Sequence, residues 1–186
     1  MALRQIRTEE DPILRKISKP VKEMTPRTLE LIDDMCESLE SFNGVGLAAV
    51  QVGVLKRICI INIDPEDLVS DPDSEEAPQA SEGYEIHTGG EDMVVINPVV
   101  EEDGCETQTG NEGCLSFPGK WGVVTRPLKV TLKAFDREMK PFELKAEGLL
   151  ARAICHETDH MDGHLYVDKV EGPVHTSDEN EEDGED

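Results

Sequence analysis

The chain has 186 residues, a length that suits one domain with a single core. No apolar run is long enough to span a bilayer, and the charged N-terminus has the features of neither a signal peptide nor a transit peptide. The formal net charge of −23 makes nucleic acid and anionic membranes poor partners. We therefore predict a cytoplasmic protein that contacts no membrane and binds no nucleic acid directly.

The negative charge is concentrated in two segments. Residues 64–92 contain 11 acidic residues and residues 171–186 contain 8, and neither segment has a Lys or Arg. The remainder of the chain has 22 acidic and 18 basic residues, so it is only mildly acidic. Segments with this composition cannot bury enough apolar surface to pack. We predict one domain over 1–170, with 64–92 as an acidic, partly mobile loop and 171–186 as a disordered acidic tail.

The first predicted element is a helix. Thr25 and Pro26 are typical of an N-cap and first turn, and Asn43-Gly44 is typical of a helix end. Apolar side chains recur between these signals at helical spacing: Leu29, Ile32, Cys36 and Leu39.

Short β-rich runs follow, and a second helix comes after them. The strand patterns occupy residues 57–63, 93–96, 99–100, 123–124, 129–135 and 141–144. Residues 147–161 are rich in helix formers, and Gly163 stands where a glycine commonly ends a helix. Several short strands with two principal helices predict the α+β class.

The second helix contains the strongest chemical signal, the pentad His156-Glu157-Thr158-Asp159-His160. Residues four apart lie on one face of a helix, so His156 and His160 can bind the same ion. Glu157 lies beside them, placed to act on a metal-bound water. The same pattern also occurs on ordinary solvated helix faces, so the surrounding residues must decide.

A catalytic ion of this kind needs a third protein ligand and an open position. In one peptidase class the third ligand follows six residues after the second histidine, and this chain has Tyr166 there. Glu171 is the nearest later carboxylate. Cys114, flanked by Gly113, is a third option, although a free cysteine is most often a plain buried thiol. The five cysteines are odd in number and follow no compact spacing, so no disulfide framework is expected.

Three segments resemble the signature motifs of peptide deformylase, in the order that family has them. They are residues 44–51 (GVGLAAVQ, against GxGLAAxQ), 112–116 (EGCLS, against EGCxS) and 156–160 (HETDH, against HExDH). The flanking segments 11–15 (DPILR) and 148–152 (GLLAR) are also similar to the family. The resemblance runs from about residue 3 to residue 170, and it implies a fold of short, mostly antiparallel strands packed around a central metal-binding helix.

The resemblance implies a hydrolase that removes the formyl group from the N-terminal methionine of nascent proteins and releases formate. Cys114, His156 and His160 would bind one metal ion, and the ion would convert its water to a hydroxide that attacks the formyl carbon. Glu157 would take a proton from that water and pass one to the leaving amine. Iron(II) is the ion implied in the cell, and zinc, nickel or cobalt could replace it at such a site.

The resemblance also implies a binding site for the substrate. The side-chain amide of Gln51 and the backbone N–H of Leu115 would stabilise the oxyanion. Leu149 and Ala153 are seven and three residues before His156, so they share its helix face and could line a methionine pocket with Val45. The backbone of Gly46 would pair with the peptide as an added strand. Each of these residues could instead serve packing alone.

The chain departs from the familiar pattern at several positions. Cys155 stands where we expect glutamine, although a helix turns it about 100° away from His156. The acidic tail replaces a C-terminal helix found in many members, so docking on ribosomal RNA by that route is not expected. The implied partners are N-formylmethionyl chains met at the ribosome, and the implied state is a monomer. The alternatives are an internal peptidase and a structural metal site, in which Cys155 or His164 would be the fourth ligand.

Overall fold

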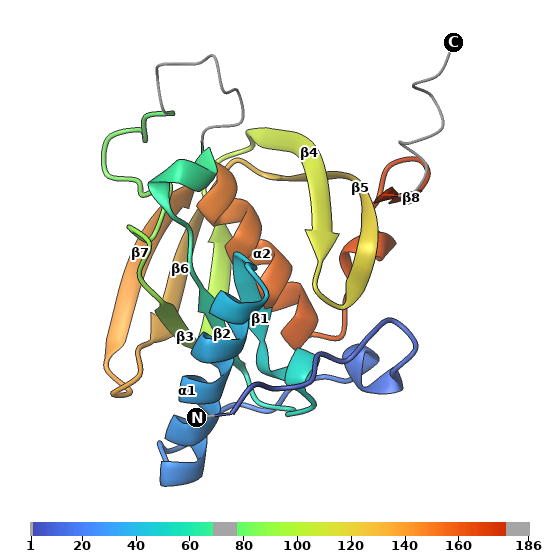
Figure 1. Cartoon of the computed structure of the whole chain (residues 1–186). Coiled ribbons are helices and arrows are strands. Elements are labelled where there is room, and N and C mark those ends of the chain that lie inside the picture. Colours follow the sequence, from blue (N-terminus) through green and yellow to red (C-terminus); the bar gives the residue numbers. More distant parts are fainter. Residues whose placement is uncertain (1, 69–77, 178–186) are drawn as a thin grey trace.

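The computed structural model describes residues 2–68 and 78–177. Its main helix, α2, lies between two antiparallel sheets, and a second helix, α1, packs on the far face of the larger sheet (Figure 1). In chain order, the elements are η1 (Pro12–Arg15), α1 (Pro26–Ser41), β1 (Gly46–Ala48), η2 (Ala49–Val52), β2 (Ile58–Ile61), η3 (Pro65–Leu68), β3 (Met93–Glu102), β4 (Thr107–Cys114), β5 (Phe117–Pro127), β6 (Lys129–Phe135), β7 (Pro141–Glu147), α2 (Gly148–Met161), η4 (Tyr166–Asp168) and β8 (His175–Thr176).

The larger sheet has five strands in the order β1-β2-β3-β6-β7, and each neighbouring pair is antiparallel. Alternate side chains of a strand point to opposite faces. Cys59 and Ile61 of β2 therefore join the core under α2, whereas Ile58 and Ile60 join the core under α1. The second sheet, β4-β5-β8, covers another side of α2. This arrangement confirms the predicted α+β class with a central helix.

Helix α1 begins as the sequence predicts. The Thr25 hydroxyl accepts a hydrogen bond from the Thr28 N–H, and Pro26 occupies the first turn, where its missing N–H costs nothing. The helix buries its apolar stripe against β1 and β2, and Asn43 follows it with a φ of 49°. The buried stripe consists of Leu31, Ile32, Met35 and Leu39.

Helix α2 ends at Met161, close to the predicted glycine stop. Gly163 has a φ of 76°, and a Cβ there would lie 2.6 Å from the backbone oxygen of Arg15. Both the dihedral angle and the close approach of the η1 backbone therefore require glycine. This contact places the N-terminal segment against the end of the helix.

The two acidic segments are more ordered than predicted over the described residues. Residues 81–85 run beside β7: the Ser81 N–H donates to Glu147 at 2.8 Å, and the Glu85 N–H donates to the Lys145 carbonyl at 2.8 Å. The tail prediction needs a correction at its start, because His175 and Thr176 form β8 by pairing with β5. The rest of the predicted tail, 178–186, and loop residues 69–77 lie outside the described residues.

Strand β4 is not among the strands predicted from the sequence. Its side chains are mostly polar or glycine, and they are largely exposed on the outward face, so no apolar alternation marks the strand. The strand exists because β5 pairs with it from Thr107↔Pro127 to Cys114↔Phe117. Across the described residues, no helix is long and apolar enough to cross a membrane.

Candidate active site

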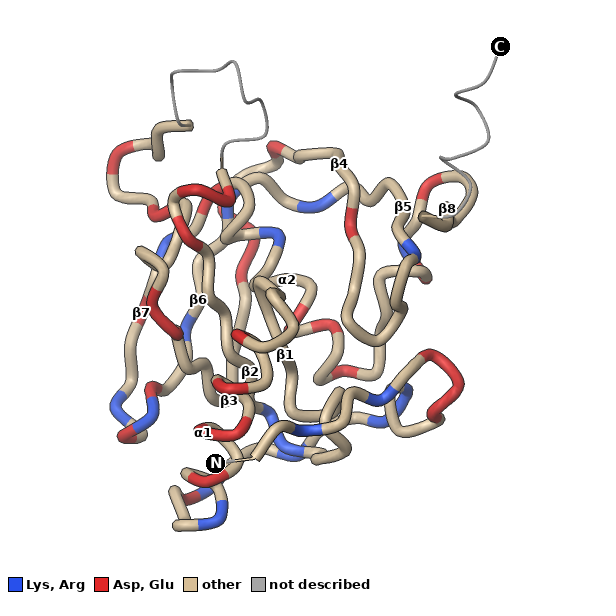
Figure 2. Tube along the Cα trace, viewed as in Figure 1, with Lys and Arg blue, Asp and Glu red and all other residues tan. Residues whose placement is uncertain are grey.

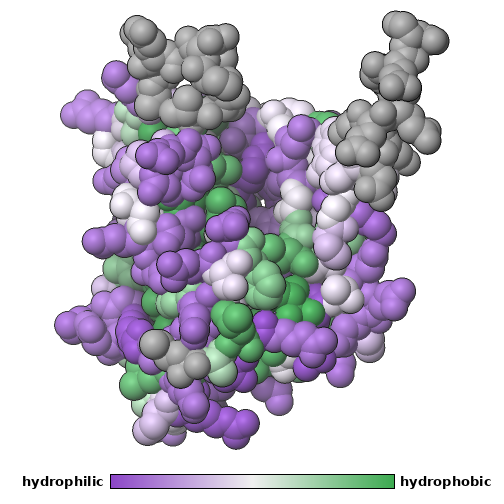
Figure 3. Space-filling model, in the orientation of Figure 1, coloured by the Kyte–Doolittle hydropathy of each residue, from purple (hydrophilic) through white to green (hydrophobic). Residues whose placement is uncertain are grey.

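An open cleft of about 720 Å³ lies between α2, the beginning of β1 and the β4–β5 hairpin. Apolar surface gathers in the middle of this face, between α1 and the hairpin (Figure 3). Ten residues were predicted for the site, and nine of them line the cleft: Val45, Gly46, Gln51, Cys114, Leu115, Leu149, Ala153, His156 and Glu157. The tenth, His160, is buried one helical turn beyond His156.

Three side chains converge at the inner end of the cleft. The ligand atoms of Cys114, His156 and His160 all lie within 4.8 Å of one another, and the Cys114 Sγ is 3.3 Å from His160 Nε2. One thiolate and two imidazoles are a donor set suited to zinc, iron(II), nickel or cobalt. Among the described residues this cluster has three protein ligands and an open side, which fits a catalytic ion better than a closed structural one.

A buried ionic network holds the cluster from behind. The Glu112 carboxylate accepts two hydrogen bonds from Arg126, at 2.8 and 2.9 Å, and a third from Arg152 at 2.8 Å. His156 Nδ1 lies 3.0 Å from the other Glu112 oxygen, so its Nε2 is the nitrogen left for an ion. Burial would raise the pKa of Glu112, but Arg126 and His156 lower it well below its usual range. The carboxylate is therefore charged at every physiological pH.

Arg126 also anchors the helix itself. Its third guanidinium nitrogen, Nη1, lies 2.5 Å from the carboxylate of Asp159, the residue before His160. The bidentate contact with Glu112 joins β5 to β4, and the contact with Asp159 joins both strands to α2. One arginine thus fixes the hairpin that contains Cys114 relative to the helix that contains the two histidines.

Glu157 is buried and lacks a partner for one oxygen. The side chain is 4% exposed, and Oε2 accepts no hydrogen bond from the described residues. Burial raises the pKa of this carboxyl to about 7, and the charge of Glu112 adds to the shift. A Cβ on Gly46 would lie 2.3 Å from Glu157 Oε1, so any side chain at 46 would displace the carboxylate.

Gln51 is held in one orientation beside the cluster. Its Oε1 accepts a hydrogen bond from the Ala48 N–H at 2.8 Å, which fixes Nε2 as the group that faces the cleft. That Nε2 donates to Ser116 Oγ at 3.1 Å and lies 3.4 Å from Cys114 Sγ. The side chain is 1% exposed, so its amide is a fixed, neutral donor in a buried setting.

The other ligand candidates lie outside the cluster. Tyr166 is buried, its ring packs edge-on against Phe117 with centroids 5.3 Å apart, and its hydroxyl has no partner among the described residues. Glu171 is exposed on the segment that runs past β5. Cys155 packs against the core between α2 and the large sheet, and burial raises its pKa to about 11. Neither Glu171 nor Cys155 belongs to the ligand group found among the described residues.

A sequence model of polypeptide deformylases matches residues 3–175. This chain belongs to the polypeptide deformylase family. It is 51% identical over 176 residues to the peptide deformylase of Lachnoclostridium phytofermentans, covering 94% of this chain and 93% of that one. It is 48% identical to the peptide deformylase of Agathobacter rectalis, covering 94% of each chain. The crystal structure of peptide deformylase from Ehrlichia chaffeensis superimposes with a TM-score of 0.80 at 33% identity, covering 92% of this chain and 89% of that one.

Membership in the deformylase family establishes the reaction. The chain is an enzyme, a metal-dependent hydrolase that removes the N-formyl group from N-terminal methionine. The structure places three residues behind the cluster to which the sequence predictions gave no role: Glu112, Arg126 and Arg152. Glu112 and Arg152 belong to segments that resemble the family, whereas Arg126 lies outside them. A signal was present, because Arg152 interrupts an apolar helix stretch, and an arginine there needs a buried partner.

Proposed function

We propose that this enzyme binds one divalent ion through Cys114, His156 and His160 and cleaves the formyl group in the adjoining cleft. The convergence of three ligand atoms within 4.8 Å, at the inner end of an open cleft, is the observation that supports this assignment most directly. When bound, such an ion acts as a Lewis acid that lowers the pKa of water and polarises a carbonyl oxygen. The network around Glu112 keeps the His156 ring oriented for the ion.

Glu157 is proposed as the group that moves protons. A general base works best when its pKa is near the working pH, and burial brings that of Glu157 to about 7. Its unpartnered Oε2 is available to accept a proton from the attacking water. The same carboxyl then donates a proton to the nitrogen of the departing methionine, so that a neutral amine leaves.

Gln51 Nε2 and the N–H of Leu115 are proposed as the donors for the oxyanion. Both residues line the cleft next to Cys114, and Gln51 is already oriented by its bond from Ala48. Donors fixed before the reaction need no reorganisation as negative charge develops on the formyl oxygen. An uncharged donor also avoids binding the ground state as tightly as a cation would.

The methionine side chain is proposed to bind among Val45, Leu149 and Ala153, which line the apolar part of the cleft. Gly46 is in strand β1, on the cleft side of the large sheet, and its backbone is proposed to pair with the substrate peptide. Backbone pairing tolerates many sequences, so the methionine pocket and the formyl site provide the selectivity. This division suits an enzyme whose substrates share only their first residue.

Iron(II) is proposed as the ion in the cell, with zinc, nickel or cobalt able to replace it. All four accept a mixed sulfur and nitrogen donor set. The substrates are proposed to be nascent N-formylmethionyl chains, met in the cytoplasm at the ribosome by a monomeric enzyme. The tail from 171 has eight acidic and no basic residues, which makes it a poor ligand for ribosomal RNA.

The reaction is tested with three peptides that offer different bonds for cleavage. Enzyme loaded with iron(II) without oxygen is given formyl-Met-Ala-Ser-amide, the acetyl-Met analogue, and a longer peptide blocked at both ends. Formate from the first peptide alone, abolished by a chelator and restored by metal, is the expected result. Cleavage of internal bonds in the blocked peptide would favour the peptidase alternative, and no product with one bound metal per chain would favour a structural ion.

A further inference from the structure

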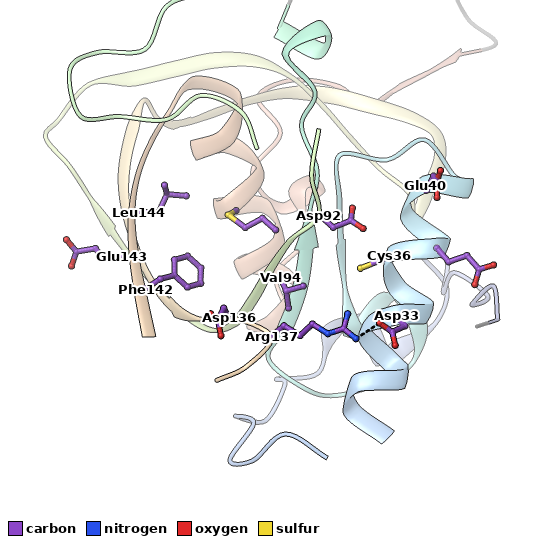
Figure 4. A pocket seen from close by; sticks show the side chains of 12 residues that line it. Asp33, Cys36, Glu40, Asp92, Val94, Asp136, Arg137, Phe142, Glu143 and Leu144 are labelled. Carbon is purple, nitrogen blue, oxygen red and sulfur yellow. Dashed lines mark ion pairs between the residues drawn. The ribbon is translucent and has the colours of Figure 1, made fainter. Parts of the chain in front are cut away.

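A second hollow, of about 870 Å³, is drawn in Figure 4 and shares no lining residue with the catalytic cleft. We call it the acidic groove. One wall is helix α1, with Asp33, Cys36 and Glu40, and the other is strand β7, with Phe142 and Leu144 (Figure 4). Its remaining lining residues are Glu37, Asp92, Met93, Val94, Asp136, Arg137 and Glu143.

The interior of the acidic groove is apolar. Met93 and Val94 of β3, together with Phe142 and Leu144 of β7, are only partly buried and line the hollow. Cys36 adds to this surface as an uncharged thiol, because burial and the nearby Asp92 raise its pKa to about 12. These groups can accept apolar side chains of an incoming ligand.

The groove also contains an unpaired stretch of strand. Strand β3 pairs with β6 only from Ile96 onward, and a register shift follows that residue. Residues Met93–Val95 pair with β2 on one side, and among the described strands they have no partner on the other. An open strand edge is a template for an extended peptide, which can form main-chain hydrogen bonds there.

The rim is strongly acidic. Six carboxylates line the groove and only one cation, Arg137, accompanies them. Arg137 lies 2.5 Å from Asp33 and closes one end, and the other five carboxylates form no ion pair with the described residues. Figure 2 shows acidic positions in red on α1 and in the segment before β3. Basic positions, in blue, occur along the N-terminal segment.

Glu37 provides an independent sign of a missing cationic partner. Its Oε2 is withdrawn from solvent, yet accepts no hydrogen bond from the described residues. A buried acceptor without a donor costs free energy that a bound ligand could recover. Glu37 is one residue from Cys36 on the helix wall, so a cation that reached it would lie beside the apolar interior.

We propose that the acidic groove binds an extended, basic segment of another protein. Lysine or arginine side chains of the segment contact Glu37, Glu40 and Glu143, and its apolar side chains enter between Met93 and Phe142. Its backbone adds to the sheet at Met93–Val95. Charge complementarity selects this occupant, because the rim repels phosphate groups of nucleic acids and lipids. The net charge of −23 likewise opposes a second copy of this chain.

The direct test uses the whole enzyme and a fluorescent peptide, acetyl-Lys-Leu-Lys-Phe-Lys-Leu-Lys-amide, which lacks formyl-Met. We expect saturable binding by fluorescence anisotropy that weakens steeply between 20 and about 200 mM salt, since the contacts are ionic. A peptide with glutamate in place of lysine should not bind. On binding, amide hydrogen exchange should slow at Met93–Val95 and leave the β4–β5 hairpin unchanged.

A matched pair of triple variants locates the site. Glu37→Gln, Glu40→Gln and Glu143→Gln together remove three charges from the rim and should weaken peptide binding about tenfold. Glu10→Gln, Glu102→Gln and Glu171→Gln remove three exposed charges outside the groove and should leave binding within about twofold. Both variants should deformylate at the rate of the unaltered enzyme.

Three results would overturn the proposal. One is the absence of peptide binding at low salt. Another is an equal loss of binding in both triple variants, which would mean that the peptide responds only to overall charge. The third is concentration-dependent dimerisation of the unaltered enzyme that the rim variant abolishes, because the groove would then be an interface between two copies.

Discussion

The molecule has two hollows of similar size, the catalytic cleft and the acidic groove, and they differ in how far their carboxylates are paired with cations. In the catalytic cleft, Glu112 is neutralised by two arginines, and the one carboxylate without an ion pair is Glu157. In the acidic groove, five of six carboxylates lack an ion pair among the described residues. The charge of Glu112 in the cleft is therefore balanced within the protein, whereas most of the charge of the groove has no counter-charge among the described residues. Balanced buried charge fixes a geometry, and unbalanced surface charge selects a partner.

Removing Glu157 should produce the largest effect. Glu157→Ala takes away the proposed proton carrier and retains all three proposed ligands, so kcat should fall by about 10²–10⁴-fold with unchanged metal content. Formate release and metal analysis on the same samples measure both quantities. Glu143→Ala in the groove is the matched control and should retain full kcat. Normal turnover in Glu157→Ala would remove this residue from the mechanism.

The buried network should matter more for stability than any surface pair. Arg126→Met leaves Glu112 and Asp159 short of a partner in the interior, so the free energy of unfolding should fall by about 3 kcal/mol in urea titrations. Metal affinity should fall by about tenfold or more, because Glu112, which contacts His156, loses one of the two arginines that hold it in place.

The control for this prediction is an exposed ion pair. Lys133 contacts Glu101 at 2.9 Å with both side chains about half exposed, so Lys133→Met should leave the free energy of unfolding nearly unchanged. If Arg126→Met and Lys133→Met lowered the free energy of unfolding equally, burial would not explain the contribution of the network behind the cleft.

A smaller effect is expected at Asp34, the fully paired carboxylate on the inner side of α1. It accepts hydrogen bonds from the Ala2 N–H at 2.8 Å and from Arg4 Nε at 2.8 Å, and the Ala2 contact is the main reason that its pKa is lowered. A lowered pKa in the folded state stabilises the protein above about pH 4, and this stabilisation disappears as pH falls through the folded value.

Asp34→Asn should therefore destabilise the protein by about 1 kcal/mol at pH 7 and by less as the pH falls below 4. Urea unfolding at a series of pH values measures the difference from the unaltered chain. A constant difference for Asp34→Asn over the whole range would mean that the ionised carboxylate contributes nothing.

The smallest expected effect is a difference in reaction rate among three thiols: Cys36 in the groove, Cys114 in the cleft and the exposed Cys105. Cys36 in the groove has a pKa of about 12, so at pH 8 only about 10⁻⁴ of it is thiolate, and it should react very slowly with a disulfide reagent. Cys105 is exposed and should react first, whereas Cys114 should react only after the metal is removed. Counting fast-reacting thiols with and without a chelator, and in Cys105→Ser, checks all three. Fast reaction of Cys36 would show that the groove wall opens readily.

The sequence predicted the parts of this structure that depend on local patterns. Spacing of four on a helix placed His156 and His160 together, and the cap at Thr25 and the stop at Gly163 follow from local chemistry. The motif resemblance supplied Cys114, which spacing left as one option among three.

The remaining features depend on long-range contacts that local patterns do not contain. Strand β4 is polar along its exposed face and is recognisable only through its pairing with β5. Nothing in the local sequence distinguishes Arg126 from the other charged residues. In the fold it forms ion pairs with both Glu112 and Asp159. The acidic groove is formed by three segments that lie far apart in the chain, so no motif marks it.

The most direct test of the central assignment is a titration of metal into metal-free enzyme without oxygen, followed by formate release from formyl-Met-Ala-Ser-amide. If Cys114, His156 and His160 form the catalytic site, activity should rise linearly to one iron(II) per chain and then remain constant. Cys114→Ser should need far more metal to reach any activity, because a hydroxyl is a much poorer anionic ligand than a thiolate. Full activity in the metal-free enzyme, or an unchanged titration in Cys114→Ser, would contradict the assignment.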